Sequence, residues 1–126
     1  MIKEVEIWLK QGLYDFESAK INFNNERYST AAFLLQQAVE KCLKSFFLCE
    51  RKGIIPQSHS LIYLASNTSL PKKFMPFLRI LTPKFIDTRY PDASIGAPFE
   101  IYGKEDVQDL MNKSSEIIKW IEKNIR

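Results

Sequence analysis

A long apolar segment covers residues 28–51 and reads YSTAAFLLQQAVEKCLKSFFLCER. Its apolar side chains recur at three- and four-residue spacing, which predicts an α-helix, and they cover more than half of its circumference. They are Ala31, Leu34, Leu35, Ala38, Val39, Cys42, Leu43 and Phe46. A helix that is apolar nearly all round is enclosed by other elements. We therefore expect this helix, opened by Tyr28 or Ser29, to lie at the centre of a bundle.

Two amphipathic segments flank this central helix in the sequence. The first spans about residues 3–24 and carries Val5, Trp8, Leu9, Gly12, Phe16, Ala19 and Phe23 on one helical face. The last spans about residues 104–124, and its stripe consists of Val107, Leu110, Met111, Ser114, Ile117, Ile118, Ile121 and Ile125. Glu105 and Asp106 at its start, and Lys123 and Arg126 at its end, complement the helix dipole. Both segments therefore predict long helices that pack against the central one.

The segment after the central helix contains helix-ending and helix-capping residues. Gly53 is expected to end the central helix because glycine tolerates positive φ. Ser58 or Ser60 is suited to cap a short helix through Leu61 and Leu64. The long helices are thus joined through shorter ones.

Further short elements follow. Pro71 suits the first turn of a helix that runs to about Leu81, and Thr82 and Pro83 suit the cap and first-turn proline of one or two more turns. Residues 89–103, with two prolines and two glycines, are expected to form an ordered loop. No strand-like alternation persists anywhere in the sequence. We expect an all-α fold, an antiparallel up-and-down bundle of three long helices plus two short ones, as one domain over residues 1–126.

Composition limits the classes of function. The 126 residues are 45% hydrophobic and 26% charged, which is ordinary globular composition. A net charge of +3 permits an anionic partner without requiring one. No stretch approaches the roughly 18–20 apolar residues of a membrane helix, and the N-terminal residues lack an apolar signal core. We therefore expect a cytoplasmic protein that does not enter a membrane.

The two cysteines and the single histidine give no cofactor pattern. Cys42 and Cys49 lie seven residues apart on one predicted helix, about 10 Å from each other, which is too far for a disulfide. Both are expected to be small apolar residues of the core. One histidine and two separated cysteines do not form a metal-ligand set, so we expect no metal and no other cofactor.

Three short motifs occur in a fixed order. They are QQAVEKCLK at residues 36–44, SHSL at residues 58–61 and TRYPD at residues 88–92. Together they resemble the HEPN family of small all-α domains, over a stretch from about Val5 to Ile121. The resemblance implies an all-α fold and a link to nucleotide binding. It also implies a homodimer and, as in many prokaryotic members, a small nucleotidyltransferase partner in a toxin–antitoxin-like pair.

A polar stripe runs along the predicted central helix. It contains Gln37, Glu40 and Lys44, with Gln36 and Lys41 at its edges and Phe33 and Phe47 one turn beyond its ends. Glu40 and Lys44 are spaced to form an i,i+4 ion pair. The stripe is consistent with a solvated face, a dimer contact or the wall of a polar cleft. In the last case Gln37, Lys41 and Lys44 are ligand-binding candidates.

The TRYPD motif presents three chemically distinct groups on one turn. Pro91 restricts Tyr90 to extended geometry and ends any helix there. Arg89 can bind a phosphate through two parallel hydrogen bonds, and Tyr90 can stack on a base. We therefore name Arg89, Tyr90 and Asp92 as ligand-binding candidates.

The same motif also fits a purely structural role. In that interpretation Arg89 forms a clamp with Asp92 or with an acid such as Asp15 or Glu40. The resemblance implies that the motif matters without deciding between the two roles.

His59 is the only side chain whose ordinary pKa suits proton transfer at neutral pH. It also suits a structural role, capping the short helix or packing on the bundle. Nuclease members of the family carry an arginine followed four to six residues later by a histidine. This sequence departs from that pattern, because seven residues separate Arg51 from His59 and no histidine follows Arg79 or Arg89.

A thin apolar seam lies on the first helix, away from its main stripe. Ile7, Tyr14 and Ile21 are spaced by seven residues. Trp120 likewise lies off the core stripe of the last helix. Scattered exposed apolar residues are common, but a regular seam suggests contact with another chain. We name Ile7, Tyr14 and Ile21 as the predicted homodimer interface.

Three functions follow from these observations. A nucleotide- or nucleic-acid-binding module ranks first, and a nucleotidyltransferase is its expected companion. A metal-independent ribonuclease that uses His59 and Arg89 ranks last, because the expected motif is absent and the two residues, thirty apart, would have to converge. No serine, cysteine or paired-carboxylate arrangement indicates catalysis, so we expect a binding module before an enzyme.

Overall fold

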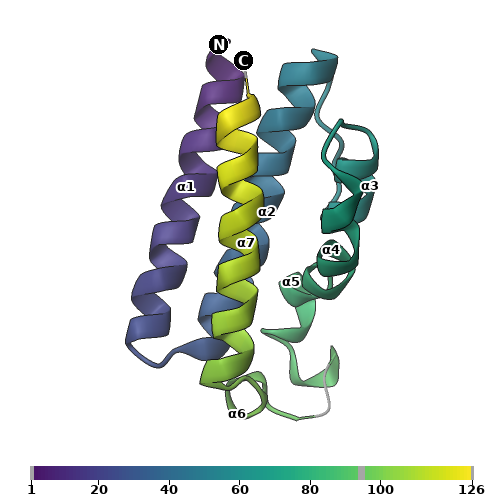
Figure 1. Ribbon diagram of the computed structural model, residues 1–126. Coiled ribbons are helices and arrows are strands. Elements are labelled where there is room, and N and C mark those ends of the chain that lie inside the picture. Colours follow the sequence, from purple (N-terminus) through teal and green to yellow (C-terminus); the bar gives the residue numbers. More distant parts are fainter. Residues whose placement is uncertain (1, 94–95, 126) are drawn as a thin grey trace.

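Three long helices form the body of the molecule. The computed structural model describes residues 2–93 and 96–125, and among them it contains helices and no strands. The long helices are α1 (Lys3–Asn24), α2 (Tyr28–Arg51) and α7 (Lys104–Asn124). Figure 1 shows them side by side, with both ends of the chain at the same end of the bundle. The predicted all-α, up-and-down bundle is therefore confirmed, and the bounds of the long helices match the predicted ones.

The central position of α2 follows from its apolar circumference. It packs against α1, α7, α3, α5 and α6, and fourteen of its residues are buried. Cys42 is one of them, as expected, whereas Cys49 is half-buried at the edge of the core. Burial raises the pKa of the Cys42 thiol to about 12, with smaller contributions from the charges of Glu122 and Asp15.

α7 packs against α2 through the predicted apolar stripe. Ile117, Ile118 and Ile121 are buried there. Trp120, expected to lie off this stripe, is half-buried and meets Phe46 edge to face at 5.4 Å. Lys123 lies in the last turn, as predicted, while Arg126 lies outside the described residues.

The chain between α2 and α7 descends along the bundle in short pieces (Figure 1). They are α3 (Leu61–Ser66), η1 (Lys72–Phe74), α4 (Met75–Leu81), α5 (Lys84–Asp87), η2 (Pro91–Ala93) and α6 (Pro98–Ile101). There are therefore more short helices than the two predicted. In particular, residues 89–103 are not simply a loop: η2 and α6 lie within them, on either side of residues 94–95, which lie outside the described part of the chain.

Two predicted helix ends are wrong. The left-handed residue after α2 is Lys52, with φ 50°, and its N–H donates to the Leu48 carbonyl. Gly53 has no positive φ. Thr82 does not cap α5, because its hydroxyl accepts a hydrogen bond from the Leu61 N–H and so joins α3 to the end of α4. Ser60 does cap α3, as predicted, by accepting from the Tyr63 N–H at 3.2 Å.

Within the described residues no helix is long and apolar enough to cross a membrane. The same part of the chain holds no group of three or more metal-binding side chains.

Candidate functional site

The polar stripe of α2 lies inside the molecule. Gln36, Glu40 and Lys44 are buried, with Glu40 only 3% and Lys44 only 8% exposed. The interpretation as a solvated face is therefore wrong. The reason is that α1 and the segment before α3 cover this side of α2, which a helical wheel does not reveal.

Glu40 is the centre of a buried hydrogen-bond network. Its Oε2 accepts from Lys44 Nζ at 3.0 Å, which confirms the predicted i,i+4 pair. Its Oε1 accepts from Gln36 Nε2 at 3.2 Å and lies 2.9 Å from His59 Nδ1. Gln37, at the edge of this network, is half-buried and donates to Gln36 Oε1 at 2.7 Å. A buried carboxylate with this many partners is well compensated for its loss of water.

The two candidate lysines of α2 are both engaged within the chain. Lys44 Nζ lies 5.4 Å from the centre of the Trp8 ring, in addition to its bond to Glu40. Lys41 forms an ion pair with Asp15 of α1, whose other oxygen accepts from Gln11. Lys41 thus joins α1 to α2 and takes no part in the Glu40 network.

His59 lies half outside this network. Its side chain is 56% exposed, and its ring stacks on Phe85 of α5 at 4.6 Å with a 29° angle between the planes. It does not cap α3, because Ser60 does. The Glu40 carboxylate only accepts hydrogen bonds, so His59 Nδ1 is the donor of this hydrogen bond. This is how a carboxylate orients a histidine for proton transfer.

Arg89 is held by backbone and rings, not by an acid. Its Nε donates to the Phe85 carbonyl at 2.8 Å, and its guanidinium carbon lies 4.5 Å from the Phe33 ring centre and 5.1 Å from that of Tyr90. No ion pair of Arg89 occurs among the described residues. The predicted clamp with Asp92, Asp15 or Glu40 is therefore absent. The guanidinium is exposed and its two terminal nitrogens have no hydrogen-bond partner in the described part of the chain.

Phe85 brings the two separated motifs together. His59 stacks on its ring, and Arg89, one helical turn later, bonds to its carbonyl. We refer to Phe33, His59, Phe85, Arg89 and Tyr90 as the His59–Arg89 surface. Tyr90 is 49% exposed, and Asp92 on η2 is exposed without an ion pair or side-chain hydrogen bond among the described residues. Sequence reasoning did not single out Phe85; its i,i+4 spacing to Arg89 was the available signal.

The predicted seam of α1 faces outward. Ile7, Tyr14 and Ile21 are 54%, 68% and 61% exposed, so none of them belongs to the core. The seam is separate from the His59–Arg89 surface, which lies where α2 meets α5.

Known proteins resemble this chain in fold and in sequence. The HEPN domain family model matches residues 5–124. TT1696 from Thermus thermophilus superposes with a TM-score of 0.88 and 24% identity, over 97% of this chain and 98% of that one. ST0689, an archaeal HEPN homologue, has 32% identity and a TM-score of 0.81, over 99% of this chain and 100% of its own. No curated protein matches the chain.

Proposed function

The chain belongs to the HEPN domain family, and from this premise we propose that it binds a nucleotide or nucleic acid at the His59–Arg89 surface. The Arg89 guanidinium is the observation that carries the proposal. It is exposed, it lies against two aromatic rings, and its terminal nitrogens have no partner among the described residues. A guanidinium fixed in this way presents parallel N–H donors that match a phosphate.

The rings beside Arg89 supply the second half of a nucleotide site. Tyr90 and His59 both expose part of their rings, and unpaired bases stack on such side chains. The sequence contains no glycine-rich phosphate loop, so the side chains would bind the phosphate. Lys41 and Lys44 contribute only indirectly, because each is paired with a carboxylate of the chain.

Calorimetry with a matched pair of arginine variants tests this proposal. Arg51 also lies over a phenylalanine of α2, 5.7 Å from the Phe47 ring centre, but away from Phe85. We expect saturable binding of ATP, GTP or a short single-stranded RNA by wild type and Arg51→Ala, at least tenfold weaker binding by Arg89→Ala, and no binding of the free nucleosides. If none of the phosphate-bearing ligands binds, or if both variants lose binding equally, the proposal is wrong.

A ribonuclease is a second candidate, for one specific reason. Within one chain, His59 stacks on the ring of Phe85 and Arg89 donates to the carbonyl of Phe85. The buried Glu40 carboxylate also orients His59. His59 Nε2 would act as the general base and Arg89 would stabilise the charge that develops on the phosphate. Cleavage of RNA in EDTA that disappears in His59→Ala would support this activity; RNA that is bound but stays intact excludes it.

The proposal includes a partner protein and a second copy of the chain. A small nucleotidyltransferase is the companion that the family suggests, and co-purification from the native host tests it. For the homodimer, antiparallel pairing of two α1 seams about Tyr14 sets Ile7 beside the partner's Ile21. Parallel pairing would instead set each residue beside its own copy and so oppose like charges such as Lys10 with Lys10. If Ile7→Asp with Ile21→Asp leaves the sedimentation mass unchanged, the seam is not the interface.

A further inference from the structure

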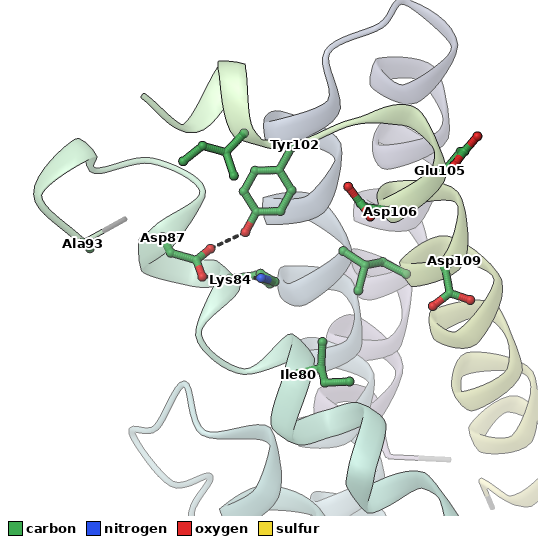
Figure 2. Close-up of a pocket in the computed structure, with 10 residues that line it drawn as sticks. Ile80, Lys84, Asp87, Ala93, Tyr102, Glu105, Asp106 and Asp109 are labelled. Atoms are coloured by element: carbon green, nitrogen blue, oxygen red, sulfur yellow. Dashed lines mark hydrogen bonds and ion pairs between the residues drawn. The ribbon is translucent and has the colours of Figure 1, made fainter. Parts of the chain in front are cut away.

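A cavity of about 590 Å³ lies between α5 and the start of α7 (Figure 2). Lys84 and Asp87 of α5 line it, whereas Phe85 of the same short helix stacks on His59. The cavity is therefore distinct from the His59–Arg89 surface. Its volume falls in the range of sites that hold small molecules.

Part of the cavity wall is hydrocarbon. Ile80, Ile101 and Leu110 contribute aliphatic side chains from α4, α6 and α7. Ile80 and Ile101 stay 53% and 38% exposed, although the chain elsewhere buries most of its large aliphatic residues. A ligand with a hydrocarbon body would remove this surface from water, which is favourable.

The charge of the wall is opposite to that of the protein. The lining contains four carboxylates, those of Asp87, Glu105, Asp106 and Asp109, and one ammonium, that of Lys84, so it carries a net charge of −3. The whole chain carries +3. A cavity with this lining attracts cations and repels nucleotides and other anions.

The carboxylates of the cavity differ in whether they already form an ion pair within the chain. Lys84 Nζ lies 3.5 Å from Asp87 Oδ2, and Lys113 Nζ lies 3.0 Å from Asp109 Oδ2. Asp106 has no ion pair or side-chain hydrogen bond among the described residues, and in Figure 2 its carboxylate points toward Tyr102 while Glu105 points away. Asp106 is thus the carboxylate available to a ligand, with Asp109 one turn further along α7.

Tyr102 shows that this wall suits an ammonium group. The Lys84 ammonium lies 5.1 Å from the centre of the Tyr102 ring, and the phenol donates to Asp87. Burial, and next the hydrogen bond to Asp87, raise the pKa of Tyr102, so the ring keeps its proton and its neutral face. An aromatic face together with carboxylates is a recurrent arrangement for binding organic ammonium ions.

We propose that this cavity binds a small organic cation of the alkyl polyamine class. The hydrocarbon segments would contact Ile80, Ile101 and Leu110, and the ammonium groups would pair with Asp106 and Asp109. A metal ion fits less well, because it would leave the aliphatic wall unused and because no three metal-binding side chains cluster among the described residues. The cavity volume favours a small molecule over a protein segment.

Titration with spermidine near physiological salt tests the proposal. We expect saturable heat with the wild-type protein, and roughly five- to tenfold weaker affinity in Asp106→Asn with Asp109→Asn, as for two partly exposed ion pairs. Glu122→Gln, which removes a charge from the far end of the same helix, is the matched control and should bind as wild type does. Equal weakening by the control, or no saturable binding by wild type, would overturn the proposal.

Two further measurements separate a shaped site from simple charge attraction. Ile101→Ser should weaken spermidine binding by roughly threefold or more while leaving every charge in place. Magnesium ion at equal charge concentration should not displace spermidine. Displacement by magnesium, or an unchanged affinity in Ile101→Ser, would mean that the carboxylates act as a diffuse negative surface. Arg89→Ala should leave spermidine binding unchanged, which keeps this test independent of the nucleotide proposal.

Discussion

α2 meets α1 and α5 in two very different ways. Against α1 the contact is close: a Cβ atom on Gly12 would lie 2.6 Å from Cys42 Sγ and 3.1 Å from the Ala38 carbonyl oxygen. Its polar pair, Asp15 with Lys41, is satisfied within the chain. Against α5 the contact is small: Arg89, which follows α5, lies over the Phe33 ring of α2 and remains exposed.

The lengths of the two partners explain the difference. α1 has 22 residues and can cover a whole face of α2, whereas α5 has four. A helix of one turn cannot exclude water from the side chains around it. Polar groups at its edge therefore keep hydrogen-bonding capacity that the α1–α2 contact has used up. This contrast is a reason, separate from the family, to look for a binding surface at α5, and four predictions test it.

The largest effect is expected from Glu40, which joins the buried core to the exposed surface. Glu40→Ala leaves the buried Lys44 ammonium without its acceptor and should lower the free energy of unfolding by about 3 kcal/mol. Chemical denaturation measures this loss. Asp15→Ala is the comparison in the α1–α2 contact, and it should cost less because the Lys41 side chain is 23% exposed. Equal losses would show that the two pairs do not differ in burial as described.

The next effect tests the close contact of α1. Gly12→Ala places a methyl group against Cys42 Sγ, and overpacking should outweigh the gain in helix propensity by about 2 kcal/mol. The double variant Gly12→Ala with Cys42→Ala removes the sulfur and should recover part of this loss. Thermal melts of the single and double variants measure both steps. A Gly12→Ala protein more stable than wild type would mean that α1 and α2 are further apart than this.

The third effect is a pH dependence that belongs to the same contact. The Cys42 pKa is about 12 in the folded protein, against an ordinary value of 9.0. Above pH 9 the unfolded chain releases this proton while the folded chain keeps it. The contribution of Cys42 to stability is therefore complete below pH 9 and is lost toward pH 12, at about 1.4 kcal/mol per pH unit.

The difference in stability between wild type and Cys42→Ala isolates this contribution from other groups that titrate at high pH. It should shrink by about 1 kcal/mol between pH 9 and pH 10. A constant difference over this range would show that the thiol ionises in the folded protein as readily as in the unfolded one.

The long helices could be predicted from the sequence because their pattern is local. Spacing alone placed α1 at residues 3–24 and made α2 central, and the structure agrees. The short helices were harder, because η2 and α6 each have only three or four residues and no periodicity to read. Gly53 failed as a helix end because Lys52 takes the left-handed conformation one residue earlier.

The candidate site could be predicted only in part. His59 and Arg89 were named, but their meeting on Phe85 is a tertiary fact that spacing does not contain. The burial of Glu40 and Lys44 was missed for a related reason: charged residues are seldom buried, and only their partners on other segments reveal the exception. The acidic cavity draws residues from five elements and left no motif in the sequence.

The smallest effect on stability should accompany the largest effect on binding. Arg89→Ala removes an exposed side chain, its contacts with Phe33 and Tyr90 and its hydrogen bond to the Phe85 carbonyl. We expect it to cost only about 1 kcal/mol of unfolding free energy, about as much as Arg51→Ala, which also loses a ring contact and a hydrogen bond to a carbonyl. If the contacts of Arg89 with Phe33 and Phe85 mainly served the fold, its removal would instead destabilise the protein well beyond Arg51→Ala. If Arg89→Ala lowered the free energy of unfolding as much as Glu40→Ala does, the contact at α5 would be structural, like the contact between α1 and α2. A near-native melting temperature together with lost nucleotide affinity would confirm that the two contacts differ. Arg89 would then contribute little to folding and much to binding, as expected of a ligand-binding side chain.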